Sequence, residues 1–313
     1  MLSEIQTQSI TMTQAQDQAS LTISGKRVVI SGWLPRMARL RSEYFESVDD
    51  PETFLTVLKT AGAKADVFTF VGNVPGKDLA GPYPVGWDYK SVLEIANYEH
   101  WWKSRINDKT RNMIRKAAKK GVSIELTEFD QTLVKGIKEI YDESPLRQGR
   151  PFPHYGKDLE TVERENATFK DRSDFIAARL DGELIGFAKL VHANGYSVLM
   201  QIIAKNLHRD KAPTNALLAK AVEICAQRRV PYLMYGKWGQ RGLGEFKKHH
   251  GFECMQIRRY FVPLNFRGRL ALAANLHQSF VTAGRRMIPD ALTEFLVDLR
   301  SRFYSRWYGT VRR

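Results

Sequence analysis

Three cationic side chains recur at i, i+4 and i+8 within one short segment, and this spacing could bind an anion. They are Arg111, Arg115 and Lys119. On a helix, residues so spaced form a single line along one face. From Lys103 to Lys120 there are eight basic residues and one acid, Asp108. The segment is therefore an anion-binding face or a solvated surface, since runs of charge are commonly just exposed.

The helix that would carry this line has clear start and stop signals. Asn107 or Asp108 can accept a backbone N–H at its start, and Gly121 can end it. Trp101 and Trp102 come shortly before it and could pin it to the core. We therefore expect a helix that is fixed on one side and cationic on another.

Positive charge is concentrated in two parts of the chain. Residues 258–313 hold eleven arginines, no lysine and three acids, while the whole chain carries a formal charge of +14. Together with the basic helix, this segment accounts for all of the chain's net positive charge. Localised charge favours a specific anionic partner over general solubility.

Other features limit the class of protein. Cys225 and Cys254 lie in apolar surroundings, which predicts core positions in a reducing compartment. No Cys/His spacing resembles a zinc site, so we expect no metal. Residues 1–24 are rich in Gln, Thr and Ser, which predicts a disordered tail without a secretory signal. No apolar run approaches the ~18 residues of a membrane span, so we expect a cytoplasmic protein.

The rest of the chain divides into three parts. Residues 25–99 predict a reduced α/β unit, residues 100–265 a larger domain, and residues 266–313 a basic helical extension. In the larger domain we expect strands at 122–129, 175–180, 184–191, 196–204, 232–235 and 252–262, and helices at 131–142, 158–169, 213–228 and 243–250. Asp181-Gly182 predicts a tight hairpin turn. The fold class is thus α+β with a mixed sheet.

This order of elements resembles the GNAT acyltransferase fold. Three motifs resemble its FemAB-like branch: the basic segment from Arg111 to Val122, the segment Gly244-Glu245-Phe246-Lys247 with the later Gly251-Phe252, and the closing segment Arg259–Leu264. The resemblance covers residues 98–265. It implies transfer of an acyl group from an activated carbonyl to an amine acceptor, either a small molecule or a peptide.

In GNAT folds the strand matching residues 196–204 splays from the strand matching 232–235, and the donor lies in the gap. The resemblance therefore implies donor binding by the backbone near Gln201, Ile202 and Ile203. Gln201 could equally alternate onto a solvent face. Tyr235 and Trp238 would line the gap, and Tyr235 could protonate a leaving group or simply pack in the core.

The donor's phosphates would lie at the start of the helix at residue 213, near Lys211, Thr214 and Asn215. The usual glycine-rich loop is absent there, although helix N-termini still favour anions. Acyl-CoA and aminoacyl-tRNA both remain candidate co-substrates, with no tightly bound cofactor. A tRNA partner would suit the basic line at Arg111, Arg115 and Lys119.

In FemAB-like enzymes the lysine of the Phe-Lys motif lies beside the donor and stabilises negative charge. The resemblance assigns this role to Lys247, and Phe246 would stack on a terminal base. Amphipathicity alone favours Phe246 as a core anchor and Lys247 as a surface cation. Glu245 is a candidate base, or an ordinary helix-surface carboxylate.

The loop 144–157 corresponds to the acceptor side of this fold. Arg147, Arg150 and Tyr155 could bind the acceptor, and His154 could act as a base because its pKa is near neutral. A lone histidine in such a loop is more often merely exposed.

Three functions follow from these observations. The first is an N-acyl or aminoacyl transferase, and the second is a non-catalytic RNA- or nucleotide-binding protein with the same fold. The third is contact with a membrane surface, because residues 292–307 mix Leu, Phe, Tyr and Trp with arginines.

Overall fold

The structure is a computed structural model, and it describes residues 12–15, 18–48, 50–72, 83–147, 150–193, 195–239 and 242–276. The chain forms two compact units. Unit 1 contains the described residues up to Lys90 and those from Cys254 onward, and unit 2 runs from Ser91 to Glu253. The sequence placed its boundaries after residues 99 and 265, whereas the units divide within one strand and at the start of another.

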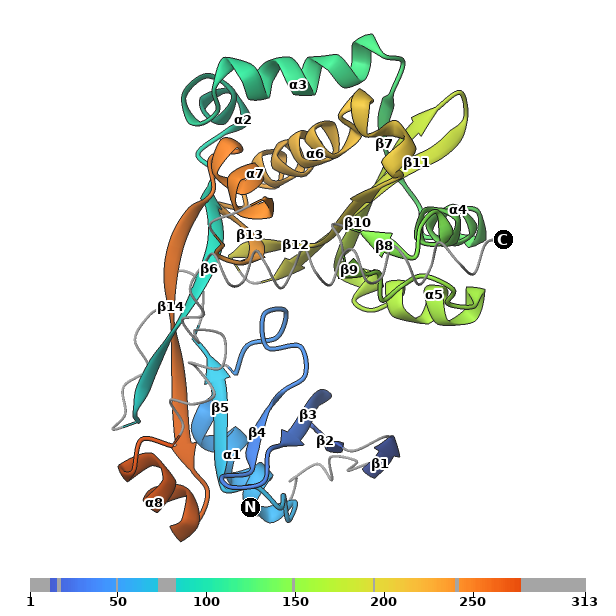
Figure 1. Ribbon diagram of the computed structural model, residues 1–313. Coiled ribbons are helices and arrows are strands. Elements are labelled where there is room, and N and C mark those ends of the chain that lie inside the picture. Colours follow the sequence, from blue (N-terminus) through green and yellow to red (C-terminus); the bar gives the residue numbers. More distant parts are fainter. Residues whose placement is uncertain are drawn as a thin grey trace, which may run out of the picture. The chain divides into compact units, whose positions relative to one another are not determined.

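Unit 1 is a mixed sheet with the strand order β1-β2-β3-β4-β5-β14 (Figure 1). Its strands are β1 (Met12–Ala15), β2 (Gln18–Ile23), β3 (Lys26–Ser31), β4 (Met37–Leu40), β5 (Val67–Val71) and β14 (Glu253–Pro263). Its helices are α1 (Pro51–Thr60) and α8 (Phe266–Ala273). The rings of Phe54, Phe68, Phe70 and Tyr260 stack in succession at 5.3, 5.6 and 5.2 Å and form the centre of its core.

Unit 2 contains a sheet with the strand order β6-β13-β12-β11-β10-β7. Its strands are the end of β6 (Val85–Glu94, of which Ser91–Glu94 belong to this unit), β7 (Ser123–Thr127), β10 (Ser173–Leu180), β11 (Glu183–Ala193), β12 (Tyr196–Ala204) and β13 (Tyr232–Lys237). A separate pair is formed by β8 (Leu146–Arg147) and β9 (Arg150–Pro151). Strands β12 and β13 pair in parallel, and the β7-β10-β11-β12 pairs are antiparallel.

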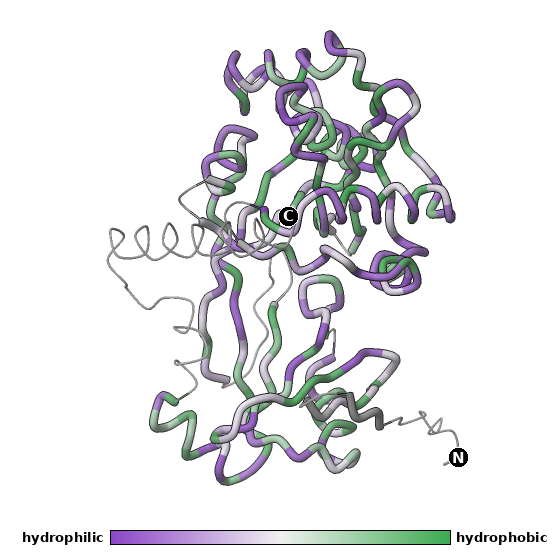
Figure 2. The backbone as a smooth tube through the Cα atoms, turned by 45° about the vertical axis from the view of Figure 1, so that its right-hand side comes forward, coloured by the Kyte–Doolittle hydropathy of each residue, from purple (hydrophilic) through white to green (hydrophobic). Residues whose placement is uncertain are grey.

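The helices of unit 2 cover both faces of this sheet. They are α2 (Tyr98–His100), the π-helix η1 (Trp101–Arg105), α3 (Asp108–Lys119), α4 (Gln131–Asp142), α5 (Leu159–Asn166), the 3₁₀ helices η2 (Lys170–Arg172) and η3 (Asn206–Lys211), α6 (Pro213–Gln227) and α7 (Leu243–His249). Along both units hydrophobic residues alternate with hydrophilic ones (Figure 2).

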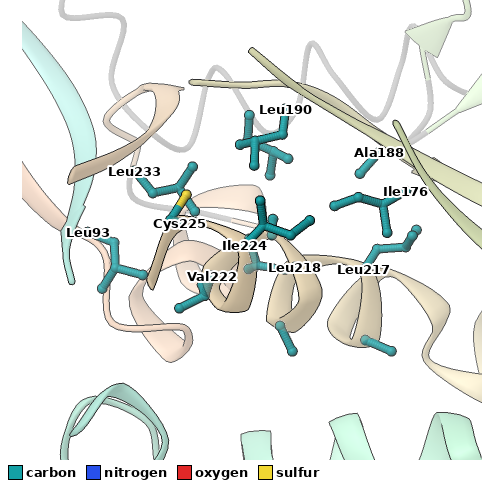
Figure 3. Packing of buried hydrophobic residues seen from close by; sticks show 14 of the residues in the cluster. Leu93, Ile176, Ala188, Leu190, Leu217, Leu218, Val222, Ile224, Cys225 and Leu233 are labelled. Atoms are coloured by element: carbon teal, nitrogen blue, oxygen red, sulfur yellow. The ribbon is translucent and has the colours of Figure 1, made fainter. Parts of the chain in front are cut away.

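Two separate cores lie on the two faces, because successive residues of a strand point to opposite sides. Ile176 of β10 packs with Leu217, Leu218 and Val222 of α6 (Figure 3). Its neighbour Phe175 packs instead with the apolar residues of α4 and α5. Helix α6 therefore fixes one face of the sheet, and α4 with α5 fixes the other.

The local sequence signals set several of these elements. Helix α4 and strand β12 have the predicted bounds, and the side chain of Asp130 caps α4 by accepting from Leu133 N. Asp181 and Gly182 form the predicted turn between β10 and β11, with φ values of 51° and 84°.

Three expectations need correction. Disorder in residues 1–24 is wrong for Gln18–Ile23, because β2 pairs with β3. Its alternating Leu21 and Ile23 are buried, although the surrounding composition is polar. Cys254 is exposed, unlike the buried Cys225. The loop 144–157 contains the β8–β9 pair rather than being irregular throughout.

Two further observations concern the described residues. None of their helices combines the length and the apolar character that a membrane crossing needs. They also contain no cluster of three or more His, Cys, Asp or Glu side chains suited to a metal ion. The stretch 292–307 lies outside the described residues.

Candidate active site

Strands β12 and β13 share only a short registered contact. The registered pairs are Ser197 with Leu233 and Val198 with Met234, while β12 continues to Ala204. Against β11, the register changes between the pairs Leu190–Leu199 and Lys189–Gln201. Met200 is therefore the extra residue of a β-bulge, which bends a strand and re-aims its side chains. The segment Gln201–Ile203 follows this bulge, beyond the registered contact with β13.

Gln201 is joined to the loop 144–157 through Tyr141, which was not among the predicted site residues. The Gln201 amide donates to the Tyr141 hydroxyl at 2.7 Å, and the Asn166 amide lies 3.4 Å from the same oxygen. The His154 ring stacks on Tyr141 with 4.6 Å between centroids. Tyr141 thus brings together two predicted site residues that are far apart in sequence. A tyrosine in an apolar helix face gives no sign of this role.

His154 lies in a mixed electrostatic environment. Burial and the nearby Lys157 ammonium lower its pKa, and Glu165 partly opposes this. Its Nδ1 lies 3.2 Å from Lys157 Nζ. An ammonium can only donate, so Nδ1 accepts and the ring proton lies on Nε2. In this tautomer Nε2 of His154 is a hydrogen-bond donor.

Lys247 is buried, with 4% of its surface exposed. Its Nζ donates to Lys237 O at 2.8 Å and lies 4.6 Å from the centroid of the Tyr235 ring. Burial lowers the pKa of Lys247 to about 8. In the described part of the chain no carboxylate pairs with it. The alternative of a surface cation at this position is therefore wrong.

The neighbours of Lys247 divide between core and surface. Phe246 packs against the α6 core and lies 4.2 Å from the His250 ring. Burial raises the pKa of Tyr235, so its hydroxyl stays protonated. Glu245 is an exposed carboxylate that pairs with Lys248 at 3.0 Å, and the same Lys248 lies over the Trp238 ring. The stacking role of Phe246 and the basic role of Glu245 stay predictions.

The start of α6 is an uncapped helix N-terminus. Ala212 precedes it with φ 57° and makes no side-chain cap. Lys211 pairs with Asp210 at 3.3 Å, while Thr214 and Asn215 are half-buried in the first turn. Desolvation acts to raise the pKa of Asp210, but the hydrogen bond from Lys211 and the charges of Lys211 and Lys116 lower it overall. The role of the α6 N-terminus in phosphate binding stays a prediction.

The three cations of the basic line have different surroundings. Arg111 Nη1 donates to Trp102 O and Ile106 O, both at 2.7 Å, and Nη2 pairs with Asp108 at 2.8 Å. Arg111 thus donates hydrogen bonds to backbone carbonyls at the π-helix η1. Arg115 lies over the Trp102 ring at 5.3 Å. Among the described residues, Lys119 alone of the three has no such partner.

We expect Arg111→Ala to lower the free energy of unfolding of unit 2 by about 1–3 kcal/mol, because several carbonyls lose a charged donor. Lys119→Ala should change it by less than about 0.5 kcal/mol, as at other exposed positions. Urea denaturation of both variants measures this. Unchanged stability in Arg111→Ala, together with weaker donor binding, would show that Arg111 serves the donor instead.

The loop 144–157 is held to β12 by Arg147. Its guanidinium donates to Ala204 O and Ile140 O, both at 2.8 Å, and pairs with Glu143 at 3.0 Å. These contacts occupy the side chain in positioning the loop. Tyr155 is exposed nearby in the chain. Arg150 contributes its backbone to β9, and its acceptor-binding role stays a prediction, as does that of Tyr155.

Solved structures resemble this chain over most of its length. A crystal structure of FemX matches with a TM-score of 0.57 and 12% identity, covering 85% of this chain and 90% of that one. L-PGS from Bacillus licheniformis matches with a TM-score of 0.54 and 12% identity, covering 80% and 85%. The chain has a FemAB-like, GNAT-type acyltransferase fold.

A third structure has the same fold. It is the C-terminal domain of a putative lysylphosphatidylglycerol synthetase from Agrobacterium fabrum, with a TM-score of 0.52, 16% identity, and coverage of 82% and 87%. No family model matches this chain, and no curated protein does. The FemAB-like fold is therefore established by structure, at sequence identities too low to carry a substrate across.

Proposed function

We propose that the chain is an N-acyltransferase or aminoacyltransferase that moves an acyl group from an activated donor to an amine. The observation that supports this most is the buried ammonium of Lys247 close to the end of β13, which has no carboxylate partner among the described residues. An uncompensated buried charge is costly, so it favours a nearby anion. The resemblance to FemAB-like enzymes implies that a negatively charged oxygen forms beside this lysine.

The reaction assigns simple roles to the neighbouring groups. The amine attacks the donor carbonyl carbon, and the carbonyl oxygen takes up negative charge, which Lys247 stabilises. When the tetrahedral intermediate collapses, the bond to the leaving oxygen or sulfur breaks, and the Tyr235 hydroxyl can supply its proton. The attacking nitrogen loses its proton to water, or to His154 after Lys157 moves away from Nδ1.

The donor is proposed to be an aminoacyl-tRNA or an acyl-CoA. Support for the tRNA comes from the basic face of α3 and from the absence of glycines at residues 209–216. Support for a transferase over a non-catalytic RNA-binding protein comes from Lys247, because nucleic-acid binding by charge needs exposed cations rather than a buried one. The proposed acceptor is a small-molecule or peptide amine.

A thermal-shift screen of the full chain tests this function. Acyl-CoAs of several chain lengths and a pool of charged tRNAs are added separately, since any donor that binds the folded state raises the melting temperature. We expect one of the two classes to stabilise the chain and then to transfer its acyl group to an added amine. If neither class binds and no product forms, the transferase proposal fails.

A further inference from the structure

Three chain segments meet at one end of the unit 1 sheet. They are the loop 32–36, the loop 61–66, and the end of β14 with α8. Strands β4 and β5 run in parallel from this end, with Met37 opposite Val67, and β14 finishes there with Pro263 opposite Val67. The topology therefore places all three segments together.

Asp66, in the loop 61–66, links the three segments through hydrogen bonds. Its carboxylate accepts from Arg36 N at 2.8 Å and from the Asn265 amide at 3.1 Å. Its carbonyl accepts from Leu264 N at 2.8 Å. Asn265 in turn caps α8 by accepting from Gly268 N. Asp66 is buried, and all of these contacts are internal to unit 1.

Large apolar side chains are exposed on both sides of this junction. Trp33 is 91% exposed and Leu34 59%, three and two positions before Arg36. Phe266 is 63% exposed and Leu270 54%, one turn apart on α8. The opposite face of α8 is buried, because a Cβ on Gly268 would lie only 2.0 Å from Asp66 O. Helix α8 is thus anchored on one face and presents an apolar outer face.

The charges around these residues have one sign. The three segments contain Arg36, Lys64, Arg267 and Arg269, and their single acid is the buried Asp66. Arg269 lies over the Phe266 ring, 5.8 Å from its centroid. We call Trp33, Leu34, Lys64, Phe266, Arg267, Arg269 and Leu270 the α8 edge.

We infer that the α8 edge docks the protein on an anionic phospholipid bilayer. Tryptophan, phenylalanine and leucine insert at the headgroup boundary, and flanking arginines attract acidic lipids. Charge complementarity favours this partner, since no exposed acid in the three segments opposes it. The inference does not rest on the proposed transferase activity, because docking requires only unit 1 residues.

Flotation of the full chain with phosphatidylcholine vesicles, with or without phosphatidylglycerol, tests the inference. We expect binding only to vesicles that contain phosphatidylglycerol, with weaker binding at high salt. Trp33→Ser with Phe266→Ser should weaken binding at least tenfold. Arg267→Glu with Arg269→Glu should also weaken it at least tenfold, since each basic residue near such a surface contributes about fivefold.

Matched controls are Leu126→Ser, an exposed apolar residue of β7, and Lys135→Glu, an exposed residue of α4. Both should bind vesicles like the parent chain, and melting curves confirm that every variant folds. Equal binding by the α8-edge variants and the parent would overturn the inference, as would equal binding to neutral vesicles. A concentration-dependent dimer lost in the Trp33 and Phe266 variant would assign the surface to a second copy instead.

Discussion

Lys247→Met should lower turnover of the preferred donor about 10²–10³-fold, the effect of removing one well-placed group that stabilises an oxyanion. Methionine keeps much of the side-chain length and suits a buried position better than lysine, so the chain should remain folded. The loss should appear in kcat rather than in donor binding, because the interaction forms chiefly as charge develops. Steady-state kinetics with the donor found by the screen measures it.

The adjacent Lys248 provides the control. It is exposed and paired with Glu245, so Lys248→Met should leave turnover nearly unchanged. The pH profile gives a second readout. Burial holds the pKa of Lys247 at about 8, so the cation is present below that pH and is lost as pH rises through it. Turnover should therefore decrease at alkaline pH. In Lys247→Arg this decrease should occur at a higher pH. An unchanged kcat in Lys247→Met would remove this role.

Trp101→Ala should lower the free energy of unfolding of unit 2 by about 3–5 kcal/mol, the range for deleting a large buried aromatic. Trp101 is completely buried in the α6 core, and its indole N–H donates to His250 O at 2.9 Å. The residue therefore joins the start of the basic helical region to the end of α7. Urea denaturation, followed by circular dichroism, measures the loss.

Two variants separate the contribution of the Trp101 ring from those of its hydrogen bond and of the neighbouring Trp102. Trp101→Phe should cost less, because it keeps most of the ring and loses mainly the hydrogen bond. Trp102→Ala should also cost less, since Trp102 is only partly buried and contacts Tyr98 and Arg115 at the margin of the core. If Trp102→Ala proves as damaging as Trp101→Ala, the basic helix is held chiefly through its outer contacts.

Sequence patterns predicted the regular elements because their signals are local. An N-cap aspartate set the start of α4, and the flanking turns set β12. The GNAT-type order followed from these elements, and the structural comparisons confirmed it. Burial of Lys247 was not predictable from helix amphipathicity, since that pattern assigned it to the surface.

The missed features depend on contacts between distant residues. Arg111 faces backbone carbonyls because η1 adopts a π-helical turn, which no residue pattern signals. Tyr141 meets Gln201 across sixty positions, and Asp66 meets Asn265 across about two hundred. Such pairs arise from the sheet topology, which brings together side chains that appear unrelated along the chain.

The division of the chain into two units also affects the order in which its parts can fold during synthesis. Among the described residues, unit 1 draws on two separate stretches of the sequence, whereas unit 2 uses one, Ser91–Glu253. During synthesis from the N-terminus, Ser91–Glu253 leaves the ribosome before β14 exists. Until then β5 has β4 on one side but lacks β14 on the other, and it exposes an open edge, which is a template for unwanted pairing. Unit 2 can therefore fold first, while the early part of unit 1 waits for the last strand to be translated.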